Sequence, residues 1–464
     1  MIGSGFAGLA AAIEAKKAGA DTVVLEKMPT AGGNSIINGG ILTATGCPQQ
    51  LKHGIKDSPE LLASDMLAAG LYMNQPEKVK LVAKSALSNY EWTVKELGVE
   101  YNLEAIGQEG GHSVPRYVFT KNGSGSGIVT KELEKLKKMG VPVRLRCYVE
   151  RIFRDDSGRV VGVQIREGYR FPKADSGKVK TIGVKKGLVL CYGGFSRDVA
   201  YRMMQDPKLV AKLDSTNQPG ATAGVLIKAL GIGAAPVQLC WLQFLPYCNP
   251  NEKGFGVSVN FTNHACMDLG LVVDRKTGKR FMDEHAGRKI KADAMFKVIG
   301  NDKNYPIAVC DDAIVKAINP SFVRLPLEMG TVKKFDTLEA LAKHFGIKQD
   351  AFLAEVKKFN NFVKEGTDKD FHRILKFNKG LDVSKPPFYG IEVCPKIHHT
   401  MGGVMINNNA QVISATTHAP IKGLYAGGEV TGGVHGASRL GTVAVIDALT
   451  FGMIAGEQFA KMKA

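Results

Sequence analysis

The sequence predicts an α/β protein in which a main domain is interrupted by an inserted domain. Three observations lead to this expectation. The first 26 residues read as a glycine-rich loop, a helix and a strand that ends in an acid, and residues 423–430 read as a second strand with the same kind of ending. A chain of 464 residues is also too long for one simple core. We therefore expect a Rossmann-like domain formed by residues 1–236 and 397–464, with an α+β capping domain at 237–396.

The chain opens on a loop with the spacing G-x-G-x-x-G, formed by Gly3, Gly5 and Gly8. A small-residue helix at 6–18 and a strand at 22–26 follow, and the strand ends at Glu26. In a dinucleotide-binding fold the first glycine makes a tight turn, the second admits a pyrophosphate and the third lets helix and strand pack closely. The helix N-terminus faces the phosphates, and an acid after the next strand binds a ribose. The opening segment therefore predicts a dinucleotide site.

Only Met1 and Ile2 precede this loop, where an apolar strand is expected. A first strand of two residues would leave the central position of the sheet nearly empty. We therefore expect that the sequence is truncated within its first strand.

A second polar, glycine-rich loop follows Glu26 in KMPTAGGNSIINGG, residues 27–40. A nicotinamide-binding domain would go directly to another helix, whereas the isoalloxazine of an extended FAD lies far from its pyrophosphate and suits a second loop. We expect contacts to FAD from Lys27, Gly32, Gly33, Asn34, Ser35, Gly39 and Gly40.

Turn and cap residues mark the elements that follow. Helices are expected at 58–70, with Ser58 as the N-cap, at 77–97 and at 126–139. A hairpin is expected at 144–166 and a buried strand at 187–195. In these parts we expect cofactor contacts from Tyr148, Val149, Gly193 and Gly194.

The C-terminal part supplies the other half of the expected flavin site. The strand at 423–430 leads into TGGVHGASRLG, residues 431–441, and then into an apolar helix that extends to about Lys461. The N-terminus of such a helix can stabilise negative charge on the pyrimidine ring of a reduced flavin. We expect cofactor contacts from Gly428, Glu429, Arg439, Gly441 and Val443.

The composition excludes several other classes of protein. No run approaches 18 consecutive apolar residues, so no transmembrane helix is expected. The eight cysteines form no CxxC, haem-attachment or zinc spacing, so no metal site is expected. The net charge of +17 is spread over the chain and suits either a solvated surface or attraction of anionic substrates and acidic electron-transfer partners. Nucleic acid is disfavoured, because no basic tract carries interleaved aromatic residues.

Four motifs carry a resemblance to a known family: STNQPGA (215–221), GKRFMDEHAGR (278–288), HHTMGGVM (398–405) and AGGEVTGGVHGASRLG (426–441). With them the chain resembles, over nearly its whole length, the flavoprotein of the fumarate reductase and succinate dehydrogenase superfamily, in its soluble flavocytochrome c branch. That branch includes fumarate reductases, urocanate reductases and related enoate reductases.

The resemblance implies a specific reaction. In this family the flavin N5 delivers a hydride to the β-carbon of a C=C bond conjugated to a carboxylate, and an arginine protonates the α-carbon. Arg288 falls on that arginine, Arg439 and His398 match the pair that clamps the carboxylate, and Thr262 is kept. A planar guanidinium binds a carboxylate bidentately, and donors at the carboxylate stabilise the enolate-like charge of the transition state.

Two departures from the family pattern concern the substrate and the supply of protons. Leu245 stands where fumarate reductases carry a second substrate histidine, which argues against a dicarboxylate and for a substrate whose far end is apolar or aromatic. Asn263 and Cys266 stand where the family has the Glu and Arg of a proton relay to the catalytic arginine. The relay is therefore either absent or rerouted, with His264 and Asp268 as candidates.

The resemblance also implies the cofactor, partners and location. No histidine precedes His53, so FAD should be bound non-covalently. Because the chain carries no haem motif, a separate cytochrome, another redox protein or domain, or a reduced nicotinamide must supply electrons. The relatives favour a periplasmic role in anaerobic respiration.

Three functions stay open at this point. The leading one is an FAD-dependent reductase of an α,β-unsaturated monocarboxylate. A ketosteroid-type FAD dehydrogenase would keep the fold and reverse the chemistry. A flavin-binding electron carrier without catalysis would account for the lost relay, but it would not account for the presence of Arg288, His398 and Arg439 together.

Overall fold

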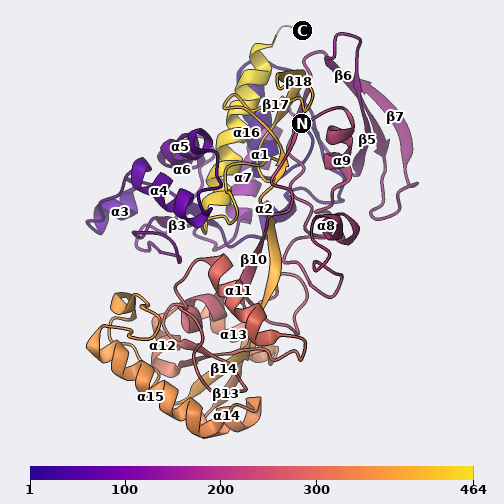
Figure 1. Ribbon diagram of the computed structural model, residues 1–464. Helices are drawn as coiled ribbons and strands as arrows, with labels where there is room; N and C mark the ends of the chain where they lie inside the picture. Colours follow the sequence, from indigo (N-terminus) through magenta and orange to yellow (C-terminus); the bar gives the residue numbers. More distant parts are fainter. Residues whose placement is uncertain (463–464) are drawn as a thin grey trace. The chain divides into compact units, whose positions relative to one another are not determined.

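The computed structural model describes residues 1–462, and the chain divides into two compact units (Figure 1). Unit 1 consists of residues 1–211, 217–243 and 399–464, and unit 2 of residues 212–216 and 244–398. Each unit buries its own hydrophobic cluster.

The elements of unit 1 follow in chain order: α1 (Phe6–Lys17), β1 (Val24–Leu25), α2 (Gly33–Ile37), β2 (Ile41–Thr43), α3 (Pro48–Lys52), α4 (Pro59–Ala69), α5 (Pro76–Lys84), α6 (Ala86–Lys95), β3 (Tyr117–Phe119), α7 (Ser126–Lys138), β4 (Val143–Arg144), β5 (Cys147–Arg154), β6 (Val160–Glu167), β7 (Lys178–Gly183), β8 (Leu188–Leu190), α8 (Val199–Gln205), α9 (Gly224–Gly231), β9 (Pro236–Val237), β16 (Gly403–Val404), β17 (Gln411–Ile413), β18 (Pro420–Ala426) and α16 (Val443–Lys461). Unit 2 contains α10 (Val259–Phe261), the π-helix η1 (Thr262–Met267), β11 (Leu271–Val273), α11 (Arg288–Ile299), β12 (Ile307–Asp311), α12 (Asp312–Ala317), α13 (Ser321–Glu328), β13 (Lys333–Phe335), α14 (Leu338–Phe345), α15 (Gln349–Glu365), the 3₁₀ turn η2 (Leu375–Asn378) and β14 (Phe388–Glu392). Two further strands, β10 (Leu242–Cys248) and β15 (Cys394–Thr400), pair with each other, and each contains one of the positions at which the chain changes unit.

The central sheet of unit 1 is built around the first residues of the chain. Strands β8 and β18 are parallel, β1 and β4 are parallel, and Ile2 bridges Leu190 on one side and Leu25 on the other. The Ile2 amide donates to the Val189 carbonyl at 2.9 Å, and the Gly3 amide donates to the Leu25 carbonyl at 2.8 Å. Met1–Gly3 thus lie at the central position of the sheet, where Ile2 forms one bridge to each neighbouring strand.

Helices α1 and α16 cross the core of unit 1 in close contact, side by side in Figure 1. A Cβ atom at Gly452 would lie 2.5 Å from the Ala7 carbonyl oxygen, and one at Gly456 would lie 2.3 Å from that of Ala11. Glycine at these two positions, one turn apart, therefore lets the backbones approach. By length and composition α16 could also cross a membrane, but 67% of its apolar window is buried inside the protein, as expected of a core helix.

The expected secondary structure is largely confirmed. Helix α4 begins after Ser58, whose hydroxyl accepts a hydrogen bond from the Leu61 amide. The single helix expected at 77–97 is wrong, because the chain forms α5 and α6 with a break at Ser85. The Ser85 hydroxyl donates to the Leu81 carbonyl at 2.9 Å, a local side-chain bond that bends helices.

In unit 2 an antiparallel sheet of order β11-β12-β14-β13 packs against α14 and α15. A fully buried ionic network lies before α11. The Arg280 guanidinium donates to Glu284 at 2.6 Å and to Asp368 at 2.8 Å, and Arg373 donates to Glu284 at 3.3 Å. Burial alone would raise the pKa of Glu284, but Arg280 and Arg373 outweigh it and hold that pKa below its usual value. This network fixes the segment that leads into α11.

Candidate active site

The glycine loop of residues 3–8 leaves no room for side chains at its tight points. Gly3 has φ +105°, and a Cβ there would lie 2.3 Å from the Cys191 carbonyl oxygen. A Cβ at Gly8 would lie 2.0 Å from the Gly3 carbonyl oxygen, and one at Gly5 would meet the Ser35 hydroxyl at 3.0 Å. The backbone between β8, α1 and the loop is therefore as close as a pyrophosphate cradle requires, and the residues present fit FAD.

Glu26 is held in place by the same loop. Its Oε2 accepts hydrogen bonds from the Ser4 hydroxyl at 2.7 Å and the Ser4 amide at 3.1 Å, and its Oε1 accepts from the Met28 amide at 2.8 Å. The Ser4 hydroxyl in turn accepts from the Gly32 amide at 3.0 Å. This chain of bonds ties the expected ribose-binding acid to both glycine loops.

The second loop is tied to segment 217–222. Asn34 Oδ1 accepts from the Gln218 amide at 2.8 Å, and the Lys27 ammonium donates to the Thr222 hydroxyl at 2.7 Å. Burial lowers the pKa of Lys27 to about 8. Asn34 and Lys27, two of the residues expected at FAD, thus also fix the STNQPGA motif, for which the sequence alone gave no structural role.

The other expected contacts of unit 1 lie on turns and strand ends. Tyr148 stacks on Tyr169 at 4.9 Å between ring centroids, and Val149 beside it is buried. A Cβ at Gly40 would lie 2.1 Å from the Thr120 hydroxyl oxygen, while Gly39 has only ordinary contacts.

Glu429 lies in a cluster with Gly194 and Thr400. Its Oε1 accepts from the Thr400 amide at 2.9 Å and lies 3.7 Å from His399 Nδ1. A Cβ at Gly194 would come within 2.3 Å of the same oxygen. Burial raises the pKa of Glu429, although the Thr400 bonds and the charge of Arg439 oppose the shift. Gly194 and Glu429, both expected to contact FAD, thus pack directly against each other.

The loop that carries Arg439 is fixed by residues that the sequence did not single out. Gln243 Nε2 donates to the Arg439 carbonyl at 2.7 Å, and the Gly441 carbonyl faces His112 Nε2 at 2.9 Å. A Cβ at Gly441 would lie 2.0 Å from Glu109 Oε2. Because these contacts are long-range, no local pattern could have identified Gln243, His112 or Glu109.

Arg439 itself is 4% exposed, with its Nη1 3.2 Å from the Leu440 carbonyl. The next helix, α16, starts at Val443 as expected, and Thr442 before it has a left-handed backbone, with φ +65°. The helix start and the arginine therefore occupy the same buried loop of unit 1.

His398 lies in unit 2 near the end of β15. Its Nδ1 is 2.7 Å from the Thr216 hydroxyl, and the Thr216 amide donates to the Ile397 carbonyl at 2.9 Å. When the hydroxyl donates to Nδ1, the ring carries its proton on Nε2, which makes Nε2 a donor suited to a carboxylate. Thr216 belongs to the STNQPGA motif, which was the only signal that pointed to it.

Arg288 is the first residue of α11, after Gly287 at the N-cap. The carbon of its guanidinium lies 5.9 Å from the ring centroid of Tyr247 on β10, a cation–π contact within unit 2. Phe244 on the same strand meets Phe296 of α11 edge to face, with ring centroids 4.9 Å apart. Leu245, which lies between Phe244 and Tyr247 on β10, is 2% exposed. Aromatic packing of β10 against α11 therefore positions the expected acid.

The relay positions lie on or beside the π-helix η1, a rare conformation that is frequent at functional sites. The Thr262 hydroxyl donates to the Ser258 carbonyl at 3.0 Å, so its proton is engaged within the helix. Cys266 is fully buried, and its side chain bonds to that of Cys310. Cys266 therefore belongs to the core of unit 2 and offers no proton path.

The two rerouting candidates pair with each other. His264 Nδ1 lies 3.1 Å from Asp268 Oδ2, and the His264 ring stacks on Phe322 at 5.3 Å.

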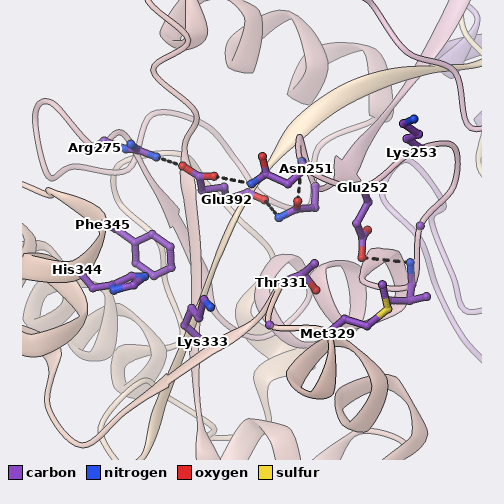
Figure 2. Close-up of a pocket in the computed structure, with 14 residues that line it drawn as sticks. Asn251, Glu252, Lys253, Arg275, Met329, Thr331, Lys333, His344, Phe345 and Glu392 are labelled. Carbon is purple, nitrogen blue, oxygen red and sulfur yellow. Dashed lines mark hydrogen bonds and ion pairs between the residues drawn. The ribbon is translucent and has the colours of Figure 1, made fainter.

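A cavity of ≈ 700 Å³ lies within unit 2, and Figure 2 shows its lining. Both of its carboxylates are engaged inside the wall: Glu392 pairs with Arg275 and accepts from Asn251, and Glu252 accepts from Ser258. None of the expected catalytic residues lines it. The cavity therefore does not carry the predicted chemistry.

Glycine turns without room for a Cβ, a fixed acid after β1 and a helix that starts at Val443 define a dinucleotide-binding protein of the Rossmann class. The family pattern described as "FAD binding domain" matches residues 1–445. The chain belongs to this family of flavoproteins, in the fumarate reductase and succinate dehydrogenase superfamily.

Relatives and solved structures agree with this assignment. The chain is 39% identical over 458 residues to an acrylate reductase flavoprotein subunit of Shewanella woodyi, covering 98% of this chain and 89% of that one. An open conformation of a flavocytochrome c3 fumarate reductase matches with TM-score 0.78 and 31% identity, over 99% of this chain and 77% of that one. A 3-ketosteroid Δ1-dehydrogenase of Sterolibacterium denitrificans matches with TM-score 0.77 at 19% identity, over 99% of this chain and 98% of that one, a likeness of fold alone.

These comparisons confirm three expectations. The fold class is the discontinuous Rossmann-like domain with a capping insertion, the cofactor is FAD, and the protein is an FAD-dependent oxidoreductase. The assignment of individual residues to the cofactor and to catalysis stays a prediction.

Proposed function

We propose that the protein is an FAD-dependent reductase of the C=C bond of a small α,β-unsaturated monocarboxylate, with acrylate as the first candidate. The observation that carries this proposal is Leu245, an apolar and buried residue at the position of the family's second substrate histidine. Acrylate has a single carboxylate and an apolar far end, which an alkyl side chain suits better than an imidazole. The 39% identity to an acrylate reductase flavoprotein subunit supports the same substrate.

Each candidate residue has a role in this proposal. FAD, when bound and reduced by the external donor, would supply the hydride for the β-carbon. Arg288 donates the proton to the α-carbon, so that one hydride and one proton saturate the bond. Arg439 and His398 bind the carboxylate, through a planar fork and through a ring whose Nδ1 faces Thr216. Thr262 contributes an oxygen that can accept a hydrogen bond, since its proton is engaged by Ser258.

The groups that bind the substrate carboxylate also affect the rate of the reaction. As hydride arrives at the β-carbon, negative charge moves toward the carboxylate oxygens. Donors placed there interact more strongly with the transition state than with the ground state, so they raise the rate as well as the affinity.

Electrons enter from outside this chain in our proposal. The matched acrylate reductase is named as a flavoprotein subunit, so a separate redox subunit or cytochrome is the expected donor. The net charge of +17 suits an acidic donor. A periplasmic place in anaerobic respiration follows from the relatives only.

Anaerobic stopped-flow reoxidation tests this function. The dithionite-reduced protein is mixed with acrylate, fumarate, cinnamate or urocanate, and flavin absorbance is followed. We expect acrylate to reoxidise the flavin fastest, and Arg288→Met to slow that rate by roughly 100-fold or more, the usual contribution of a general acid.

Three results would contradict the proposal. Faster reoxidation by fumarate than by acrylate would refute the monocarboxylate assignment. Reoxidation by none of the four above the rate in buffer would favour the carrier, and flavin bleaching by a saturated 3-ketosteroid would favour the dehydrogenase.

A further inference from the structure

Helix α11 begins against the usual rule of charge placement. Its first four residues are Arg288-Lys289-Ile290-Lys291, and its first turn contains no acid. The N-terminus of a helix carries a partial positive charge, so basic residues there are destabilising. Lys289 is partly compensated by Asp293, at 2.8 Å. A local rule broken this clearly is expected at a functional site.

Lys291 is the unusual member of this turn, because it is only 2% exposed. Its ammonium donates to the Tyr247 hydroxyl at 2.8 Å and to the Glu284 carbonyl at 3.0 Å. The same ammonium lies 4.6 Å from the centroid of the Tyr247 ring. A buried ammonium is costly unless it is hydrogen-bonded, so its position is specified by these acceptors.

The ring of Tyr247 is therefore in contact with two cationic side chains. Arg288 contacts its ring at 5.9 Å and Lys291 at 4.6 Å. Arg288 and Lys291 are three residues apart on one helix, which places them on the same face. The acceptor Glu284 is fixed by the buried Arg280 and Arg373 network.

We propose that Tyr247 and Lys291 are positioning residues for the catalytic acid: the Tyr247 ring orients the Arg288 guanidinium, and the Lys291 charge makes that guanidinium give up its proton more readily. This inference rests on the proposed function. Two like charges in a site of low dielectric disfavour the charged form of each. The pair thus eases proton donation in a chain whose relay positions hold Asn263 and Cys266.

Other titratable groups also face Lys291 within unit 2. The charge of Lys291 acts on Asp283 and His285, in the segment before α11. Burial lowers the pKa of His285 to about 4, so His285 is neutral at physiological pH. Burial raises the pKa of Asp283. The pH test below therefore compares variants that differ only at Lys291 or Tyr247.

The experiment uses the full chain with FAD bound and compares Lys291→Met with Lys291→Arg. Flavin content, the acrylate KM and the rate of reoxidation by acrylate are measured against pH. Loss of the like charge raises the pKa of Arg288 and makes it a weaker acid. We expect Lys291→Met to lower the rate by about tenfold, equivalent to about one pKa unit, with an unchanged KM, and its alkaline limb to move to higher pH. Lys291→Arg keeps the charge and should retain the rate.

Tyr247 gives an independent comparison that does not depend on the folding of the lysine variants. Tyr247→Phe keeps the ring under Arg288, and Tyr247→Leu removes it. We expect the leucine variant to lose about tenfold in rate and the phenylalanine variant to lose much less.

The inference is overturned if Lys291→Met keeps the wild-type rate and pH profile, if Lys291→Arg loses as much as Lys291→Met, or if Tyr247→Leu is as fast as wild type. Arg288→Met separates this inference from the proposed function. If that variant stays active, the proposed role of Arg288 is wrong; if it is inactive while Lys291→Met is normal, only the positioning pair is wrong.

Discussion

Substitution of Gly8 by alanine tests the glycine cradle directly, because two physical effects predict opposite outcomes. Gly8 lies in the first turns of α1. By helix propensity alone, alanine would stabilise the helix by about 1 kcal/mol relative to glycine. By packing, the added methyl group meets the backbone of the loop that is expected to hold the pyrophosphate.

The structure decides which effect is larger. The new Cβ would lie 2.0 Å from the Gly3 carbonyl oxygen, whereas ordinary van der Waals contact begins near 3.4 Å. The obstacle is backbone, so no side chain can rotate away, and the Cys191 Cβ lies 3.3 Å off as a second neighbour. Overpacking of this kind costs about 1–3 kcal/mol or more. A 2.0 Å contact with backbone belongs at the upper end of that range, about 2–3 kcal/mol. After the propensity gain of about 1 kcal/mol, we therefore expect Gly8→Ala to lose about 1–2 kcal/mol of unfolding free energy, and about tenfold in FAD affinity.

Urea unfolding and FAD titration of the apoprotein measure both losses. Gly231→Ala is the matched control, since Gly231 is also helical and a Cβ there has no atom within 4 Å. The control should be unchanged or slightly more stable. If Gly8→Ala is as stable as wild type and binds FAD equally well, the cradle does not have the geometry described.

Three further predictions follow from the same structure. In steady-state assays, Leu245→His should raise the ratio of kcat/KM for fumarate to kcat/KM for acrylate by about tenfold, whereas Leu245→Met should leave this ratio unchanged. If both variants keep the wild-type ratio, the argument that Leu245 sets specificity is contradicted. Burial lowers the pKa of His112 to about 4, so at acidic pH the unfolded chain binds a proton that the folded unit excludes. The free energy of unfolding should therefore fall by about 3 kcal/mol as the pH is lowered from about 6.5 to about 4. The urea midpoints of His112→Gln should lack this part of the pH dependence. Thr216→Val removes the partner of His398 Nδ1 and should raise the KM for acrylate by about tenfold with a smaller effect on kcat; an equal loss in both would contradict a role in ground-state binding.

Sequence reasoning succeeded where the determining physics is local. The loop at Gly3–Gly8, the helix after it and the Ser58 cap depend on neighbours within a few residues, and each is where it was expected. It failed at Ser85, where one hydroxyl bonding back to Leu81 divides a pattern that periodicity alone reads as continuous.

The surroundings of the expected acid depended on long-range contacts and could not be predicted in the same way. The same holds for the other expected site residues, because Gln243 and His112 bond to the loop of Arg439 and Thr216 faces His398, all over long distances in the sequence. Of these three residues only Thr216 stands in a motif. Sequence reasoning gave the family and therefore the position of Arg288. It could not show that the Tyr247 ring faces that arginine, because Tyr247 lies on β10, far earlier in the chain.

The replacement of the relay has an electrostatic meaning that a comparison of positions alone does not reveal. A Glu and an Arg together carry no net charge, and neither do Asn263 and Cys266, so their exchange removes proton carriers without changing the net charge near the acid. Lys291 instead adds a positive charge from a different position, beside the same ring as Arg288. A neighbouring cation eases donation and hinders reprotonation by the same free energy. In the proposed mechanism, Lys291 therefore makes Arg288 a stronger acid than it would be without that neighbouring charge.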